Sequence, residues 1–469
     1  MQPGPLLLVL LCCCLSGGGA NRVYIHPFHL FAADNVSCET LQNHTFKPLE
    51  SVSVAPLDMA VLTPDQRGPS ERDNVTQDVT QRTAVLAELL NSLGLRMYQA
   101  LSGKQPAANT LFSPVNTYGS LVTFDMGASK KTARSFQDLL GLSSGTDRED
   151  CVSLVDGGMV LKTLHSINQQ PQDHISAQAW LFTRPHVRLS QDVVQGAGDF
   201  SHSSFVRAVD FSQPGEHLQR VNTFVDKTSH GRVKEAFRDV DVKFNLLFLT
   251  SFHFQANFPS QKTSLQEFHV NHTTTVMTPM MTHVGLHRYF HDKVRGCTVI
   301  KLALSERSYM LVVLPDHGVN LHDIQAKLRT DVIASWKGNL HQGLLELSLP
   351  KLSMSSVNDV RHLLANMDPE VESRLLGSQA EFSQLANSDT FTLDKAINAV
   401  SLEMSEEEAV RRDKMEEEAL QDKTEEEALQ DKMEQDPLQV RINRPFFFSV
   451  MDADCDAMFL LGKISTPTL

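Results

Sequence analysis

The sequence predicts an α+β protein, because helical and strand-like patterns both occur along one continuous stretch of chain. Apolar residues recur at helical spacing from Ala84 to Met97, and Gly103 ends that pattern. Short apolar runs rich in branched and aromatic residues follow and favour buried strands. We expect amphipathic helices at Ser135–Leu140 and His217–Lys227, strands at Phe244–Phe254, Cys297–Leu304, Tyr309–Leu314 and Leu344–Leu349, and a hairpin of Phe446–Phe448 with Ala457–Leu461. This mixture is typical of the α+β class.

The chain opens with a segment that has the features of a secretory signal. An apolar run from Leu6 to Leu15 is followed by small residues that end at Ala20. This pattern predicts cleavage between Ala20 and Asn21, and the run is too short to span a bilayer. A buried N-terminal strand is the disfavoured alternative. We therefore expect residues 1–20 to be a signal peptide and the mature protein to be secreted.

Residues 31–83 are predicted to form an extended, glycosylated arm that precedes the body, residues 84–469. The arm lacks sustained periodicity and contains four prolines. Three of the four N-x-S/T sequons of the mature chain lie within it, which indicates an exposed segment. The expected glycosylation sites are Asn35, Asn43, Asn74 and Asn271.

The net charge of −14 argues against nucleic acid and anionic membranes as partners. Most of this charge lies in Glu403–Asp436, which has 15 acidic and 5 basic residues. A nine-residue repeat, Met415–Lys423 and Thr424–Lys432, fills much of that segment. Its Ala-Leu pairs would point to opposite sides of a helix, so no apolar face could hold such a helix against the body. We interpret the segment as a solvated loop, and an acidic docking tail is the alternative.

Four cysteines remain after the signal, namely Cys38, Cys151, Cys297 and Cys455, and they allow three complete pairings. No C-x-x-C pair is among them, so zinc and redox motifs find no support. The chain also lacks the phosphate-loop, dinucleotide-binding, zinc-protease and nucleophile-elbow motifs. The sequence therefore predicts no enzyme activity, no cofactor and no metal site.

The body, residues 84–469, resembles the serpin family. The resemblance rests on the order and spacing of short motifs, each of which is weak alone. The motifs are Asn109–Asn116, Leu121–Leu142, Val209–Phe211, Val221–Val225, Gly231–Val233, Thr278–Met281, Leu311–Asp316, Leu347–Lys351, Asn443–Phe448 and Leu461–Lys463. The resemblance implies three β-sheets, about nine helices and an exposed reactive loop, here within residues 403–444. It also implies a disulfide between Cys38 and Cys151, whereas Cys297 and Cys455 stand in strand-like apolar contexts and are expected to be buried thiols.

The predicted reactive loop does not suit a protease inhibitor. Inhibitory serpins insert the cleaved loop as a new strand in the main sheet, which requires small, uncharged residues at the hinge. Here Glu408 stands where the family has a glycine, and charged residues at 411–413 replace its alanine run. Either strand register would bury charge at a cost of several kcal/mol per poorly paired ion. We expect a non-inhibitory member, with an inhibitor and a carrier of a small hydrophobic hormone as the alternatives.

The ten residues after the expected signal resemble the hormone segment of a non-inhibitory branch of this family. The match covers nine consecutive residues, and only Asn21 departs, where many relatives have Asp. An ordinary leading strand is the alternative, but it does not account for such a match at this place. The segment consists of Asn21, Arg22, Val23, Tyr24, Ile25, His26, Pro27, Phe28, His29 and Leu30.

The resemblance implies a plasma precursor of a vasoactive peptide that regulates blood pressure and salt and fluid balance. Renin, an aspartic protease, is expected to cut Leu30–Phe31, because bulky apolar residues flank that bond. A converting enzyme is then expected to remove His29-Leu30, which leaves Asn21–Phe28 for a G-protein-coupled receptor. Pro27 fixes its own φ and biases His26 toward extended geometry, and an extended substrate is what such a protease cleft binds.

Overall fold

The structure is a computed structural model, and it describes residues 27–32, 49–65, 77–143, 155–169, 175–210, 214–238, 244–386, 391–406 and 436–467. The expected signal peptide, residues 21–26 of the expected hormone and the acidic repeat lie outside these ranges.

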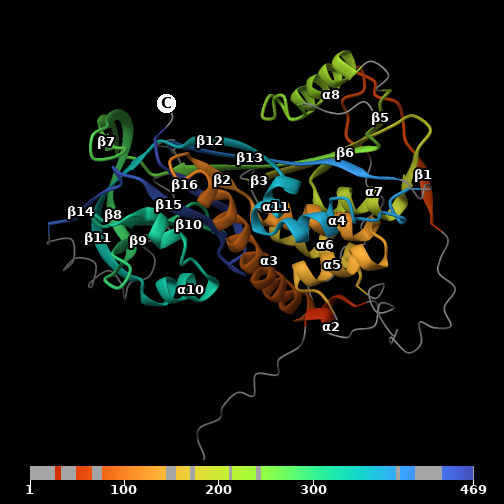
Figure 1. Ribbon diagram of the computed structural model, residues 1–469. Helices are drawn as coiled ribbons and strands as arrows, with labels where there is room; N and C mark the ends of the chain where they lie inside the picture. Colours follow the sequence, from red (N-terminus) through yellow and green to blue (C-terminus); the bar gives the residue numbers. More distant parts are fainter. Residues whose placement is uncertain are drawn as a thin grey trace, which may run out of the picture.

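Three β-sheets organise the described residues (Figure 1). The main sheet has the strand order β12-β13-β6-β3-β5, in which β13 is parallel to β6 and β5 is parallel to β3. The second sheet has the order β14-β11-β8-β9-β10-β15-β16-β2, with β7 paired to β8, and the third joins β1 to β4. The strands are β1 (Ser51–Ser53), β2 (Thr110–Phe112), β3 (Ile175–Thr183), β4 (Arg188–Ser190), β5 (Ser203–Ala208), β6 (Leu246–Phe258), β7 (Lys262–His269), β8 (Thr275–Asp292), β9 (Cys297–Ala303), β10 (Ser308–Pro315), β11 (His341–Pro350), β12 (Ser353–Asp359), β13 (Leu393–Glu406), β14 (Leu438–Arg441), β15 (Phe446–Asp452) and β16 (Met458–Ile464).

Helices cover both faces of the main sheet. In Figure 1 a group of helices lies beneath this sheet, α8 lies above it, and α10 lies beside the second sheet. The helices are α2 (Pro27–Phe31), α3 (Gln77–Lys104), α4 (Pro114–Gly127), α5 (Lys130–Leu140), α6 (Gly157–Asn168), α7 (Gln191–Phe200), α8 (Pro214–Thr228), α9 (Leu321–Gln325), α10 (Thr330–Asn339), α11 (Val360–Met367) and α12 (Pro369–Leu375). Across the described ranges, no helix is both long and apolar enough to cross a membrane.

The predicted α+β fold with three sheets is confirmed, and so are the predicted helices and strands of the body. Eleven helices occur in the described part of the chain, compared with the nine or so expected. The α3 helix begins at Gln77, seven residues before the start of the predicted body at Ala84, so it extends into the segment expected to be arm.

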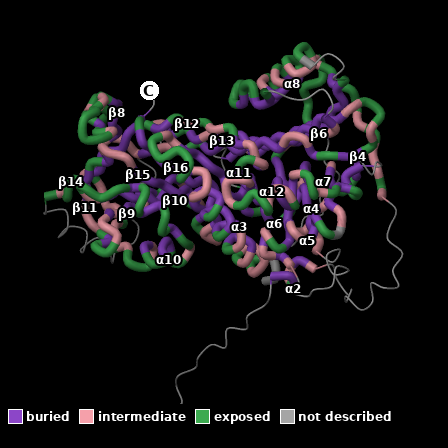
Figure 2. Tube along the Cα trace, in the orientation of Figure 1, coloured by how far each residue is buried: buried purple, intermediate pink, exposed green. Residues whose placement is uncertain are grey.

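Two apolar cores lie on opposite sides of the main sheet. The larger core joins the lower helices to both large sheets, and the smaller core lies between the main sheet and α8, around Trp180 and Phe224. Figure 2 shows the buried residues continuing through both large sheets. Because the main sheet is covered on both faces, its inner strands β6 and β3 are buried at nearly every position.

A buried polar cluster fastens the main sheet to α4. Asn398 of β13 is 1% exposed and lies directly opposite Thr250 of β6. Its Oδ1 accepts hydrogen bonds from Thr250 Oγ1 at 2.8 Å and from Ser120 Oγ at 3.1 Å, and its Nδ2 donates to Thr117 Oγ1 at 2.8 Å. The Asn398 side-chain amide therefore connects β13 and β6 to α4 beneath them.

Asn398→Val should lower the free energy of unfolding by about 1–3 kcal/mol, because it leaves buried hydroxyl groups without this partner. Urea unfolding followed by circular dichroism measures the loss. Val357→Ala on the neighbouring β12 is the matched control, since Val357 is 50% exposed. Equal stability of the Asn398 variant and the control would show that the cluster does not hold the sheet.

Asp125 on α4 makes stability depend on pH, because burial raises the pKa of its carboxyl from 3.8 to about 7, although the Gln137 amide bonds to it. The folded state binds this proton more tightly than the unfolded state, so stability falls as the pH rises from about 4 to about 7. Asp125→Asn should therefore stabilise the protein by about 2–3 kcal/mol more at pH 8 than at pH 5. Urea unfolding at both pH values tests this, with the exposed Asp138→Asn of α5 as the control.

Candidate functional site

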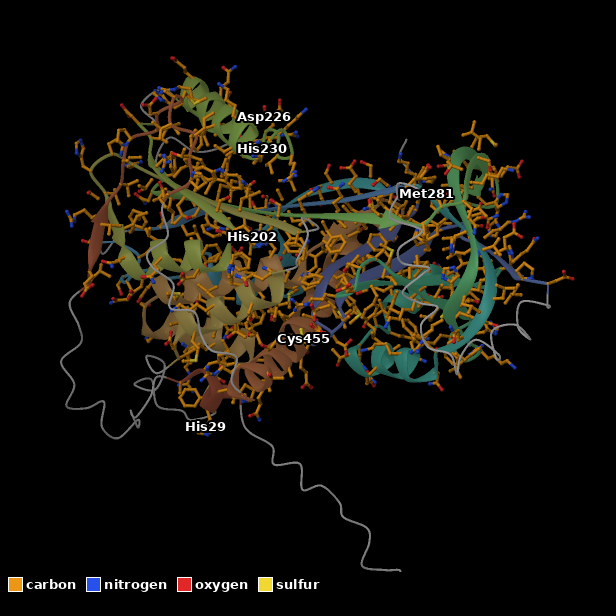
Figure 3. The ribbon with its side chains drawn as sticks, turned by 180° about the vertical axis from the view of Figure 1, so that it is seen from behind. His29, His202, Asp226, His230, Met281 and Cys455 are labelled. Atoms are coloured by element: carbon orange, nitrogen blue, oxygen red, sulfur yellow. The ribbon has the colours of Figure 1, made fainter. Side chains whose placement is uncertain are left out.

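The expected cleavage bond lies in a short helix that packs against the body. Pro27–Phe31 form the five-residue α2, in which Pro27, Phe28 and Phe31 are buried. Phe31 is fully buried in the larger core, and Phe28 is 8% exposed. The α2 helix contacts α3 and α6. Figure 3 shows His29 at the far end of the helical layer, where its side chain is exposed.

Hydrogen bonds hold the main chain on both sides of the Leu30–Phe31 bond. The Nε of Arg82, in the first turns of α3, donates to the carbonyl oxygen of Leu30 at 3.1 Å. The backbone N–H of Asp156 donates to the carbonyl oxygen of Phe31 at 2.8 Å. Ala32 then forms an isolated antiparallel bridge with Val155. The oxygen that a protease must polarise therefore already has a partner from the body.

Asp156 is available for this contact because it starts α6. Its side chain accepts from Met159 N at 2.9 Å as the N-cap of that helix, and its own backbone N–H, which has no partner within the helix at this position, bonds to Phe31. Sequence reasoning missed both Arg82 and Asp156. Arg82 lies 52 residues from Leu30, and no local pattern relates the two.

Residues 27–31 are helical, so the structure does not present the expected cut as the extended substrate that a protease cleft binds. The reason is apolar burial: Phe28 and Phe31 leave water only when the chain folds back onto α3 and α6. Burial of two such rings contributes about 3–6 kcal/mol. A protease cleft binds an extended strand, so the segment must detach from the body before the bond can be cut.

Several of the expected site residues lie outside the described residues. These are Ala20, Asn21, Arg22, Val23, Tyr24, Ile25 and His26 of the signal junction and hormone, the cysteines Cys38 and Cys151, and the sequons at Asn35, Asn43 and Asn74. Of the expected decapeptide, the structure therefore describes only the last four residues, 27–30, together with the residues that follow the cut.

The fourth sequon lies in the turn between β7 and β8. Asn271 Oδ1 accepts hydrogen bonds from Thr273 N, Thr273 Oγ1 and Thr274 N, each at 2.9 Å. These bonds occupy the oxygen of the Asn271 amide and leave its nitrogen facing away from them. Because Asn271 and its neighbours in the turn are exposed or half-buried, the turn is accessible to a modifying enzyme.

The two described cysteines are free thiols. Cys297 begins β9 and is fully buried, and burial raises the pKa of its thiol to about 12. Cys455 was expected in a strand, but it lies in the turn between β15 and β16 and is half-buried. Burial also raises the pKa of the Cys455 thiol, so neither group is a thiolate near neutral pH.

The strand that leads into the expected reactive loop is paired along its whole length. β13 follows β6 in parallel register from Leu393 opposite Leu246 to Glu406 opposite Phe258. At its end, Glu406 Oε1 accepts a hydrogen bond from Thr263 Oγ1 at 2.8 Å. β6 and β13 pair directly with each other, so no strand of the expected reactive loop lies between them. Glu408 and the other predicted hinge residues lie outside the described ranges.

No group of three or more His, Cys, Asp or Glu side chains in the described ranges is placed to hold a metal ion.

The family model described as Serpin (serine protease inhibitor) matches residues 88–467. The chain therefore belongs to the serpin family. The fold agrees with this: the solved structure of mouse protein-Z dependent protease inhibitor superposes with a TM-score of 0.70, at 18% identity, over 83% of this chain and 99% of that chain.

Within the family, the chain is similar to angiotensinogens along nearly its whole length. It is 27% identical to angiotensinogen of Rattus norvegicus and 24% identical to that of Homo sapiens, in each case over 95% of this chain and 94% of the relative. The similarity extends beyond the serpin body, because the matched body begins only at residue 88.

Phe31→Ala should release the cleavage segment, because truncating a buried Phe costs about 3–5 kcal/mol of packing. We expect the hydrogen-exchange rate of peptides that cover 27–32 to rise at least tenfold. A tenfold rise corresponds to a loss of about 1.4 kcal/mol in the free energy of local opening. Exchange within the core strand β10 separates this local opening from global destabilisation. Val61→Ala, at a 45% exposed apolar residue of the arm, is the control. Unchanged exchange at 27–32 would show that Phe31 does not hold the segment.

Proposed function

We propose that this protein is a secreted, non-inhibitory serpin that serves as the precursor of an angiotensin-like hormone. Renin cuts Leu30–Phe31 and releases the angiotensin I-like decapeptide Asn21–Leu30. The observation that carries this proposal is the decapeptide itself, which stands directly after the expected signal in a chain similar to angiotensinogens over 95% of its length.

The later steps of the proposal follow from the same segment. Angiotensin-converting enzyme removes His29-Leu30, and the octapeptide Asn21–Phe28 acts on a G-protein-coupled angiotensin receptor to regulate blood pressure and salt and fluid balance. The precursor circulates in blood plasma after signal cleavage at Ala20. It carries a Cys38–Cys151 disulfide and glycans at Asn35, Asn43, Asn74 and Asn271.

Release of the peptide depends on opening of the α2 segment, because two kinds of contact hold the Leu30–Phe31 bond against the body. Burial of Phe28 and Phe31 holds the side chains, and the bond from Arg82 holds the carbonyl oxygen of Leu30. The cleavable population is the small open fraction, so the observed kcat/KM is the intrinsic value multiplied by that fraction. The body thereby lowers the rate of peptide release.

The absence of inhibitory activity is supported by the charges at the expected hinge. Insertion of a loop strand would first have to separate β6 from β13, which are paired from Leu393 to Glu406. The inserted strand would then carry Glu408, Arg411, Arg412 and Asp413 into a sheet that is covered on both faces. The cost of burying those charges opposes the insertion that a serpin inhibitor needs.

Arg82→Gln should raise kcat/KM for renin cleavage about fivefold, because loss of one hydrogen bond costs the closed state about 1 kcal/mol. The test incubates the full chain with species-matched renin and measures released Asn21–Leu30 by mass spectrometry. Arg96→Gln is the matched control, since Arg96 is an exposed arginine on the same helix. A synthetic peptide, Asn21–Asp34, reports the intrinsic rate in the absence of the body.

If renin releases no decapeptide from the full chain, the precursor function is wrong. If the wild type, the Arg82 variant and the synthetic peptide share one kcat/KM, cleavage stands but the body does not restrain it.

The charged hinge predicts that no serine protease is trapped. Incubation with a panel of trypsin-like, chymotrypsin-like and elastase-like enzymes should give no covalent complex on denaturing gels. Cleavage within residues 403–444 should leave the Tm unchanged, because no strand is added to the main sheet. An inhibitory serpin treated in parallel is the positive control. One stable complex would overturn the non-inhibitory assignment.

A further inference from the structure

The outer edge of the main sheet is covered by part of the N-terminal arm. β5 is the last strand of the sheet order, so only its inner side is paired, to β3. Residues 55–65 run along the other side, and Pro56 forms an isolated parallel bridge with Ala208. In Figure 1 the orange-red arm follows β5 at this edge.

The arm bonds four of the six backbone groups that face outward from β5. Alternate residues of a strand point their N–H and C=O groups to opposite sides, and Ser204, Val206 and Ala208 face outward. The O of Ser204 accepts from Asp65 N at 2.9 Å, the N of Ala208 donates to Ala55 O at 2.7 Å, and the O of Ala208 accepts from Leu57 N at 2.8 Å. The strand edge is therefore paired as though a further strand were present.

One ion pair completes the cover at the centre of the strand. Asp65 Oδ2 accepts from Val206 N at 2.7 Å, and Asp65 Oδ1 pairs with Arg207 NH1 at 2.6 Å. The same NH1 donates to Val206 O at 2.9 Å, and Arg207 NH2 donates to Thr63 O at 3.2 Å. The Arg207 side chain is 5% exposed and that of Asp65 is 39% exposed, so the pair fastens the arm to a buried cation.

We propose that residues 55–65 are a detachable cap on the main sheet, and that the β5 edge beneath them is a surface through which two copies of this chain associate when the cap is displaced. An uncovered edge strand presents unpaired donors and acceptors that fit another extended strand. A second copy offers the same edge, and two β5 strands related by a twofold axis pair antiparallel around Val206. The cap keeps the protein monomeric. This inference does not depend on the proposed hormone function.

The arrangement of the arm supports a cap in preference to a structural strand of the sheet. Among residues 49–65 the only strand assigned is β1 (Ser51–Ser53), and it pairs with β4, away from β5. Residues 55–65 contain Pro56 and Pro64, which cannot donate to a ladder, and Val61 and Leu62 remain exposed. Leu57 is buried in the smaller core and Met59 packs against it half-buried, so two apolar side chains of the segment contact that core. The cap is thus held mainly by main-chain bonds and the Asp65–Arg207 pair.

The test removes both charges, because Asp65→Ala alone would leave a buried guanidinium unpaired and endanger folding. Asp65→Ala with Arg207→Met removes the ion pair and keeps the apolar stem of residue 207. In dilute solution, hydrogen exchange of peptides spanning 203–208 should rise at least tenfold. As concentration increases, light scattering should detect dimers, and the same peptides should become protected again.

Asp58→Ala is the matched control, because Asp58 lies on the same arm and its Oδ1 accepts only from Ala60 N. This variant and the wild type should remain monomeric. Should the double variant fail to fold, Asp65→Asn keeps an acceptor for Val206 N and should give a smaller change in the same direction. Wild-type exchange at 203–208 in the folded variants would overturn the cap. If residues 203–208 exchange rapidly but the double variant stays monomeric at every concentration, the proposed association surface is wrong.

Discussion

The pairing of β13 with β6 is the interaction on which the rest of the structure depends. It runs in parallel register from Leu393 to Glu406 and places Asn398 opposite Thr250. Asn398 also forms hydrogen bonds with α4. The main sheet and the helical layer beneath it are therefore joined by a buried polar cluster. Because β13 and β6 are paired directly and the sheet is covered on both faces, a strand inserted between them must first break this pairing.

The N-terminal segment contacts the body at several places, including the β1–β4 pairing, and two of these contacts have different physical reasons. At residues 27–32, apolar burial dominates, since Phe28 and Phe31 pack against α3 and α6. At residues 55–65, main-chain hydrogen bonding dominates, because the edge of β5 would otherwise have unpaired groups. The contact at residues 27–32 holds the expected cleavage bond against the body, and the contact at residues 55–65 covers the edge of β5.

These attachments agree with a protein that is acted upon by a protease. The expected cut lies at one end of the molecule, beneath the helices, whereas β13 leads into the expected reactive loop at the opposite side (Figure 1). Nothing in the described contacts links the two regions directly. Under the proposed precursor function, the rate of cleavage at Leu30–Phe31 depends on local opening of α2, which contacts α3 and α6, and not on movement of the main sheet.

The sequence by itself determined the α+β class, the position of α3, and strands such as β9, β10 and the β15–β16 hairpin, because periodicity and apolar runs are local properties. The order of short motifs also identified the serpin family, which the family match confirms. Tertiary structure alone decided the geometry at Leu30–Phe31 and the cover on β5. Arg82 lies 52 residues from Leu30, and Arg207 lies 142 residues from Asp65, so neither contact has a local signature. An isolated Pro27–Phe31 peptide has nothing against which to bury its rings. Only the folded α3 and α6 make a helix there more favourable than an extended chain.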